Sequence, residues 1–234
     1  MEKGACRGFA VEAIAETLWP TRCALCDRPG KVLCNDCART LDFIDYWQTC
    51  PRCGAPWGRI QCDHCATDAL LHDLTPRLCL GALRYTDRTA TLIKTFKDKG
   101  EQRLAATLAA LVARCAPPSW PAWAQCVTFV TATKSARRRR GFDHMELVAN
   151  ELSRIWGIPC KRLLAPPRAK DQRALGRLGR LSNMGDRFRV DGTPAAHRAI
   201  VIDDVLTTGA TMDDACRALE AAECACRSLV VARV

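Results

Sequence analysis

The chain has 234 residues, a formal net charge of +10 and sixteen cysteines. Its content of 48% apolar and 26% charged residues is typical of a folded globular protein and excludes a largely disordered chain. No segment approaches the roughly 18 uncharged apolar residues of a membrane span, so we expect no membrane insertion. Glu12 and Glu16 interrupt the apolar stretch near the N-terminus, which therefore lacks the pattern of a secretory signal. We expect a reducing, cytoplasmic setting.

Residues 1–20 are the first of three predicted parts. Phe9, Ile14 and Leu18 are spaced to share one face of a helix, so this part is predicted to be a short amphipathic helix. Residues 21–70 are predicted to form a cysteine-rich, zinc-binding module, and residues 78–234 a larger domain.

Eight of the cysteines form four C-x-x-C pairs, in a part of the chain that lacks helical periodicity. Each pair presents two thiolates in a tight knuckle, and two pairs complete a tetrahedral site of four sulfurs, so two zinc ions are predicted. A redox dithiol is the competing interpretation, but four successive pairs without a βαβ context favour metal. The predicted ligands are Cys23, Cys26, Cys34, Cys37, Cys50, Cys53, Cys62 and Cys65.

The simplest arrangement places the first two pairs in one site and the last two in the other, although a crossed arrangement also satisfies the count. His64 lies between two ligands and is expected to be a bystander. Because the module has few large apolar residues, zinc is expected to drive its folding. The eight remaining cysteines lie in apolar stretches and are predicted to be buried thiols.

Apolar strands alternate with amphipathic helices from residue 78 onward. Strands are predicted at 78–85, 127–132, 160–164, 199–202 and 228–232. Helices are predicted at about 87–97, 102–115, 143–156 and 212–222. Uniformly apolar strands separated by helices are typical of a parallel sheet that is covered on both faces. The predicted fold class is therefore α/β, a parallel sheet with flanking helices, plus a small N-terminal zinc module.

Two adjacent carboxylates, Asp203 and Asp204, follow the predicted strand at 199–202. Ligands of open α/β sheets bind at this carboxyl end of the strands. The small residues that follow lead into a helix, and such a loop offers backbone N–H groups, hydroxyls and the positive end of the helix dipole to a phosphate. Because carboxylates accept hydrogen bonds from sugar hydroxyls, the segment predicts a site for a phosphorylated pentose. The alternative is a capped helix whose two acids are only solvated.

The charge excess comes from residues 134–189, which hold 15 Lys and Arg against 5 Asp and Glu, a difference of +10. Residues 134–140 are predicted to be a basic loop, and residues 172–189 a glycine-containing lid. Their arginines indicate contact with a diphosphate or a nucleic-acid backbone, and a solvated charged loop is the alternative. The predicted anion-binding residues are Arg137, Arg138, Arg139, Arg140, Arg173, Arg177 and Arg180.

The low aromatic content bears on how a nucleic acid would be bound. Only 6% of the residues are aromatic. We therefore expect contact with the phosphate backbone and a steep dependence of affinity on salt, rather than base stacking.

The segment from Val201 to Met212 resembles the phosphoribosyl-diphosphate motif of type I phosphoribosyltransferases. The resemblance implies that Asp203 and Asp204 contact the ribose hydroxyls. It also implies displacement of pyrophosphate at the anomeric carbon, with Mg²⁺ held mainly by the diphosphate. Purine-salvage members have an aspartate where Thr207 stands, which argues against that subclass. The residues implied to hold the 5′-phosphate are Thr207, Thr208, Gly209, Ala210 and Thr211.

Five separated motifs together resemble the ComF family, the phosphoribosyltransferase-like proteins of bacterial DNA uptake and natural competence. They are the cysteine pairs, the strand ending Leu83-Arg84-Tyr85, the run Arg138-x-Arg140-Gly141-Phe142, the spaced Gln172, Leu175, Arg180, Asn183 and Phe188, and the Asp203 motif. The resemblance covers about residues 20–234. It implies a cytoplasmic role in handling single-stranded DNA, retained binding of phosphoribosyl diphosphate, and a DNA-uptake helicase or another competence protein as a partner.

The chain departs from the family in the loop that ordinarily holds the diphosphate. Residues 131–135 replace a frame that contains Pro and His, and Asp143-His144 replaces an amide pair. Lys134 is expected to compensate by adding a positive charge to the site for phosphoribosyl diphosphate. Three functions stay open: a DNA-handling protein that binds phosphoribosyl diphosphate, an active phosphoribosyltransferase of nucleotide salvage or modification, and a structural zinc adaptor for an uptake helicase. The sequence assigns no catalytic residue.

Overall fold

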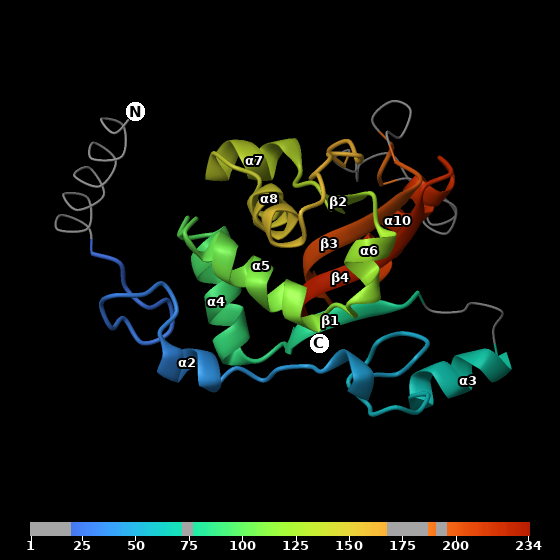
Figure 1. Cartoon of the computed structure of the whole chain (residues 1–234), viewed down its shortest axis with the longest axis horizontal. Coiled ribbons are helices and arrows are strands. Elements are labelled where there is room, and N and C mark those ends of the chain that lie inside the picture. The colour runs from blue at the N-terminus through green and yellow to red at the C-terminus, as the bar shows by residue number, and fades with distance from the viewer. Residues whose placement is uncertain (1–19, 72–76, 168–186, 191–195) are drawn as a thin grey trace, which may run out of the picture.

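The structure, a computed structural model, describes residues 20–71, 77–167, 187–190 and 196–234 (Figure 1). The predicted N-terminal helix, and Arg173, Arg177 and Arg180 of the predicted lid, lie outside the described residues. Among the helices that the structure describes, none combines the length and the apolar content that a membrane crossing requires.

Four parallel strands form the central sheet. In the order in which they lie side by side they are β1 (Cys79–Arg84), β4 (Ala225–Arg233), β3 (Arg198–Leu206) and β2 (Cys126–Phe129). Every pairing is parallel, and Ile202 of β3 lies between Phe129 of β2 and Leu229 of β4. The predicted parallel α/β sheet is confirmed.

The predicted strand at 160–164 is wrong. Cys160 makes a single parallel bridge with Val127, and Leu164 makes a single antiparallel bridge with Val190. The ladder is interrupted because the N–H of Leu163 donates to the hydroxyl oxygen of Thr128, at 3.3 Å, and not to a backbone carbonyl. This segment covers the outer edge of β2 without becoming a strand.

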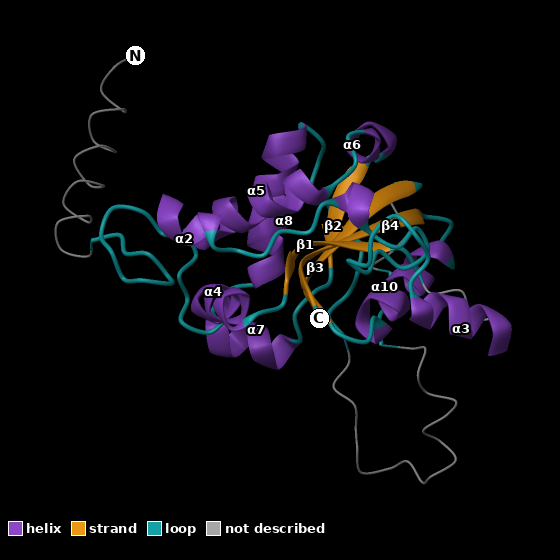
Figure 2. Ribbon diagram, turned by 90° about the horizontal axis from the view of Figure 1, so that it is seen from below, coloured by secondary structure: helices purple, strands orange, loops and turns teal. Residues whose placement is uncertain are grey.

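Helices cover both faces of the sheet, as predicted. The helices α5 (Leu104–Cys115) and α8 (His144–Trp156) pack on one face, and α10 (Ala210–Glu220) packs on the other (Figure 2). Strand β3 serves both sides, because Ile200 and Ile202 belong to the core beneath α5 and α8, whereas Val201 belongs to the core beneath α10. Two further helices, α4 (Asp87–Lys97) and α6 (Ser119–Trp123), complete the connection from β1 to β2.

The basic segment predicted as a loop is a helix, α7 (Lys134–Arg140). The hydroxyl of Thr133 caps its start by accepting a hydrogen bond from the N–H of Ala136, at 3.1 Å. Gly141 ends it in a left-handed conformation, with φ of 81°, before α8 begins. The prediction of a loop considered only the run of arginines, whose charges repel one another. The caps at both ends stabilise the helix in spite of this repulsion.

The cysteine-rich module lies along the edge of β1. It contains two helices, α2 (Asn35–Arg39) and α3 (Asp63–Leu71), and the 3₁₀ turn η1 (Tyr46–Gln48). Phe43 forms an antiparallel bridge with Leu83, and the N–H of Ile44 donates to the carbonyl of Ala82 at 3.0 Å. The module therefore occupies a sheet edge that would otherwise be open to another chain.

Candidate functional site

The chain leaves β2 and β3 toward opposite faces of the sheet. After β2 it continues through α7 into α8, and after β3 it continues into α10 on the other face. Because β2 and β3 are neighbours, their carboxyl ends mark the point at which the connections diverge. Open α/β sheets bind ligands at such a point. The predicted Asp203 and Asp204 lie at this end of β3.

The carboxylate of Asp204 is buried and contacts the side chains of Lys97 and His144. Lys97, the last residue of α4, places its ammonium 2.5 Å from Oδ2, and Nε2 of His144 lies 3.1 Å from the same oxygen. The other oxygen, Oδ1, accepts a hydrogen bond from the N–H of Val205 at 2.7 Å. Lys97 was not predicted as a site residue, since no local motif surrounds it, and only the packing of α4 brings it to β3.

The pKa values of the two adjacent acids are shifted in opposite directions. Burial, together with the charge of Asp204, raises the pKa of Asp203 well above its ordinary value. Burial also acts to raise the pKa of Asp204, but the hydrogen bond with His144 and the charge of Lys97 outweigh it, and this pKa lies below its ordinary value. The negative charge of the pair therefore resides first on Asp204.

A second layer of contacts holds His144 in place. The guanidinium of Arg140 lies 3.5 Å from Nδ1 of His144 and 3.3 Å from the carboxylate of Asp98. Asp143 caps α8 and also accepts a hydrogen bond from the N–H of Ala132, at 3.0 Å. The end of α4, the turn between α7 and α8, and the end of β3 thus meet around Asp204.

The predicted basic residues fall into two groups. Arg140 has only 10% of its side chain exposed and takes part in the contacts around His144. Arg137, Arg138 and Arg139 are exposed on α7, and Lys134 is exposed at its first turn. The exposed group offers a compact cationic surface, whereas Arg140 contacts His144 and Asp98.

The predicted phosphate loop joins β3 to α10. Thr207 and Thr208 are exposed, and Gly209 has the left-handed φ of 85° that starts the helix. Ala210 and Thr211 belong to the first turn of α10, whose N–H groups have no partner within the helix. The loop therefore offers hydroxyls, backbone donors and a helix dipole at one place, as its sequence predicted.

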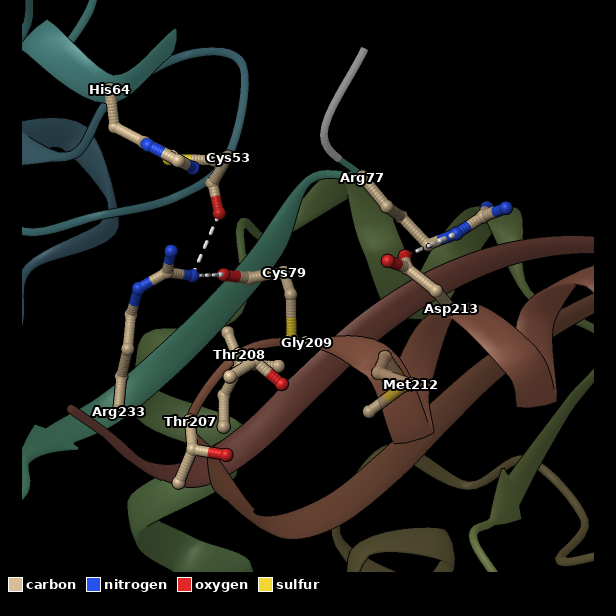
Figure 3. A pocket seen from close by; sticks show the side chains of 11 residues that line it. Cys53, His64, Arg77, Cys79, Thr207, Thr208, Gly209, Met212, Asp213 and Arg233 are labelled. Atoms are coloured by element: carbon tan, nitrogen blue, oxygen red, sulfur yellow. Dashed lines mark hydrogen bonds and ion pairs between the residues drawn. The ribbon is translucent and has the colours of Figure 1, made fainter. Parts of the chain in front are cut away.

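A pocket of about 440 Å³ opens beside this loop (Figure 3). One wall is Thr207 to Gly209 with Met212 and Asp213, and the opposite wall comes from the cysteine-rich module. The guanidinium of Arg233 joins the two, since one of its terminal nitrogens donates to the carbonyls of Cys53, at 2.8 Å, and Cys79, at 3.0 Å. No local pattern in the sequence predicts this pocket, because its walls come from segments that are far apart in the chain.

The eight predicted zinc ligands form two groups of four. Within each group all four sulfurs lie within 4.8 Å of one another. The first two C-x-x-C pairs make one group and the last two make the other, so the simpler arrangement is confirmed, and His64 belongs to neither group. The groups are Cys23, Cys26, Cys34 and Cys37, and Cys50, Cys53, Cys62 and Cys65.

The surroundings of both groups suit zinc. The N–H of Cys34 donates to the sulfur of Cys23, and the N–H of Cys62 donates to the sulfur of Cys50, each at 3.4 Å. Such donors stabilise thiolates, which are the form that binds the metal. The two clusters fit two zinc ions in tetrahedral sulfur sites.

The cysteines outside the clusters are mostly buried, as predicted. Cys79, Cys115, Cys126, Cys216 and Cys224 are buried, whereas Cys160 and Cys226 are half-buried. Burial raises the pKa of Cys115 to about 12 and that of Cys126 to about 11, so these thiols stay protonated. Cys6 lies outside the described residues.

Aromatic side chains are few in this chain, but two of those in the cysteine-rich module are exposed. Trp47 and Trp57 of the module are 47% and 53% exposed, and Ile60 nearby in sequence is 67% exposed. The low aromatic content therefore does not exclude stacking on bases or contact with a protein partner.

Comparisons with known proteins match the cysteine-rich part of the chain to a family model. Residues 14–80 match the family model of the double zinc ribbon domain. The structure is similar to the crystal structure of orotate phosphoribosyltransferase from Aeropyrum pernix, with a TM-score of 0.36 and 19% identity. That match covers 64% of this chain and 66% of the other, just under two thirds of its length. A search of curated proteins finds no match.

Proposed function

We propose that the chain binds phosphoribosyl diphosphate at the carboxyl ends of β2 and β3. The observation that carries the proposal is the placement of the acid pair. Asp203 and Asp204 lie near the carboxyl end of β3, where the connections diverge, and two residues after them the loop from Thr207 leads into the N-terminus of α10. Acids for hydroxyls and donors for a phosphate thus follow one another along one short segment.

In the proposed complex the loop Thr207–Thr211 holds the 5′-phosphate, and the acids accept hydrogen bonds from the ribose. Asp204 already has partners, so the ribose hydroxyls replace Lys97 on its Oδ2. The released ammonium then lies beside the diphosphate, where Lys134 and Arg140 add positive charge. Mg²⁺ is proposed to arrive with the diphosphate and to offset its charge.

We further propose that single-stranded DNA binds along α7, in a ComF-like role in DNA uptake in the cytoplasm. The support is the surface of Arg137, Arg138 and Arg139, which are exposed on one short helix beside the site. Guanidinium groups at this density attract a phosphate backbone regardless of sequence. A DNA-uptake helicase or another competence protein is the proposed protein partner.

Two other functions have an observation in their favour. The complete acid pair and phosphate loop favour an active phosphoribosyltransferase that displaces pyrophosphate in nucleotide salvage or modification. The exposed Trp47, Trp57 and Ile60 favour a zinc adaptor that contacts a protein through the module. Production of pyrophosphate from phosphoribosyl diphosphate with an added base distinguishes the first, and loss of helicase binding on replacement of Trp47 and Trp57 by Ser distinguishes the second.

The test of ligand binding is calorimetric titration with phosphoribosyl diphosphate and Mg²⁺. The double variant Asp203→Asn with Asp204→Asn should lose at least tenfold in affinity while retaining its circular dichroism and its zinc. Asp87→Asn, in the exposed first turn of α4, removes a comparable charge away from the site and should bind like the parent. Equal affinity of the double variant and the parent would refute the assignment.

The test of DNA binding compares two triple variants. Replacement of Arg137, Arg138 and Arg139 by Ala should weaken binding of a single-stranded oligonucleotide. Log affinity falls as log salt rises, and the variant should make this negative slope shallower by up to about 2. The control replaces three arginines that are exposed on other elements, Arg39, Arg59 and Arg198, and should leave the slope close to that of the parent. If both variants lose affinity equally, the attraction comes from net charge and not from α7.

A further inference from the structure

His144 has a different partner at each of its two ring nitrogens. Nε2 lies 3.1 Å from Oδ2 of Asp204, and Nδ1 lies 3.5 Å from a terminal nitrogen of Arg140. The side chain is only 7% exposed, and its ring lies beside the ring of Phe96, with 6.3 Å between the two centroids. The imidazole is therefore held in one orientation, between the carboxyl end of β3 and the end of α7.

These two partners decide which ring nitrogen carries the hydrogen. Asp204 is ionised at neutral pH, since its pKa lies below its ordinary value, and a carboxylate can only accept a hydrogen bond. Nε2 therefore donates to Asp204. A guanidinium can only donate, so Nδ1 is the acceptor that faces Arg140. A ring that donates at Nε2 and accepts at Nδ1 is the neutral imidazole, because a second proton at Nδ1 would face the charge of Arg140.

The other charged groups near the ring leave this assignment unchanged. Lys97 of α4 contacts the same Oδ2 of Asp204 and not the ring. Oδ1 of Asp143 lies 3.9 Å from Nδ1, but both oxygens of that carboxylate already accept hydrogen bonds from backbone N–H groups. Asp98 pairs with the other terminal nitrogen of Arg140, at 3.3 Å, and so holds the guanidinium in place beside Nδ1.

A neutral donor can stay on Asp204 while a charged ligand binds. Oδ1 of Asp204 accepts from the N–H of Val205 at 2.7 Å, and Oδ2 accepts from His144, so the carboxylate is held at both oxygens. When a diphosphate attracts the ammonium of Lys97 away from Oδ2, an uncharged imidazole has no comparable attraction to follow it. His144 then keeps its hydrogen bond, and the remaining lone pairs of Asp204 keep their direction.

We propose that His144, as a neutral donor, is the positioning residue that holds Asp204 in the orientation in which it accepts the ribose hydroxyls. The inference rests on the proposed binding of phosphoribosyl diphosphate. Arg140 supports this role, because its guanidinium keeps Nδ1 without a proton.

Substitutions distinguish a neutral donor from a cation. His144→Gln can donate from its amide nitrogen to Asp204 and accept from Arg140, but it carries no charge. His144→Lys keeps a donor and adds a fixed charge beside Arg140, whereas His144→Leu removes the donor. In calorimetric titration with phosphoribosyl diphosphate and Mg²⁺, we expect His144→Gln to bind within about threefold of the parent affinity, and His144→Lys and His144→Leu to bind roughly tenfold or more weakly. Recovery of affinity in His144→Lys but not in His144→Gln would overturn the proposal, since the histidine would then act as a cation.

Pyrophosphate with Mg²⁺ is the probe for a role that concerns the ribose, because it has the diphosphate without the sugar. His144→Leu and His144→Gln should bind it within about twofold of the parent, since neither change removes a charge from the diphosphate site. Equal losses of affinity for pyrophosphate and for phosphoribosyl diphosphate in His144→Leu would overturn the proposal, because the whole site would then be disturbed. His197→Leu, at an exposed histidine, is the matched control and should bind both ligands like the parent.

Because His144 is buried, each variant is first checked for folding by its zinc content and melting temperature. If His144→Leu does not fold, the comparison of His144→Gln with His144→Lys decides, because both keep a long polar side chain. Nitrogen-15 NMR of the parent chain also reads the ring directly, without a ligand. We expect one ring hydrogen, at Nε2, at neutral pH, and a ring that is protonated at both nitrogens would overturn the proposal.

The outcomes separate this inference from the proposed function. If the parent does not bind phosphoribosyl diphosphate, the proposed function is refuted, and the positioning role is refuted with it. If the parent binds and a folded His144→Leu binds equally well, only the role of His144 is refuted.

Discussion

The ammonium of Lys97 lies 2.5 Å from the carboxylate of Asp204, although 107 positions of sequence separate the two residues. This contact joins the end of α4 to the end of β3, and with His144 it keeps the negative charge of a buried acid compensated. Whatever binds Asp204 must first take the place of Lys97.

Replacing Lys97 tests how much this contact stabilises the fold. Lys97→Met should lower the free energy of unfolding by about 1–3 kcal/mol at neutral pH, because it leaves a buried carboxylate with His144 as its only side-chain partner among the described residues. Lys94→Met, on the exposed side of the same helix, should cost less than about 0.5 kcal/mol. Urea unfolding of both variants measures the difference. Equal costs would mean that the Lys97 contact contributes no more than a surface charge.

The acid pair should give two opposite dependences of stability on pH. The pKa of Asp203 is raised in the folded state, so its ionisation destabilises the fold increasingly as pH rises above the unfolded value of about 4. Asp203→Asn should therefore be more stable than the parent at pH 7, with the gain shrinking toward pH 4. Urea unfolding at pH 4, 5.5 and 7 checks this trend.

Asp204 should behave in the reverse sense. Its pKa is lowered in the folded state, so its stabilising contribution is fully present above about pH 4 and is lost as pH falls further. Asp204→Asn should be less stable than the parent at pH 7, and the two should converge in acid. A stability difference that is constant across pH would show that the substitution acts through packing and not through charge.

The sequence predicted what depends on local pattern. Apolar runs located all four strands, and the spacing of cysteines located both zinc clusters, because these signals are contained within one segment. What it missed depends on distant segments. Lys97 reaches Asp204 only through the packing of α4, and Arg140 is buried by Asp98 and His144 although its neighbours on α7 are exposed. The strand expected at 160–164 failed because a single side chain, Thr128, replaced a backbone acceptor.

Zinc content should distinguish the ligand cysteines from the buried thiols. The parent should contain about two zinc ions per chain, Cys65→Ser about one, and Cys115→Ser two, since Cys115 is buried outside both clusters. Metal analysis after dialysis measures this. Cys65→Ser should also release the second half of the module from β1, seen as faster hydrogen exchange of Cys79, whose N–H donates to the carbonyl of Cys53. Two zinc ions in Cys65→Ser would contradict the assignment of the second cluster.

Gly54 should be the position at which the module is most sensitive to an added methyl group. It has a φ of 78°, and a Cβ there would lie 2.3 Å from the carbonyl oxygen of Cys79, so Gly54→Ala adds a backbone clash to a strained conformation. Gly58→Ala is the matched control, because its φ of 103° brings strain but its Cβ would meet no atom within 4 Å. We expect a loss of about 2–5 kcal/mol for Gly54→Ala and about 1–2 kcal/mol for Gly58→Ala, measured by urea unfolding. Since Cys53 precedes Gly54 and its carbonyl binds Arg233, Gly54→Ala should also displace the Arg233 side chain, whereas Gly58→Ala should not. Equal losses in the two variants would mean that the close contact between Gly54 and β1 does not hold the module in place.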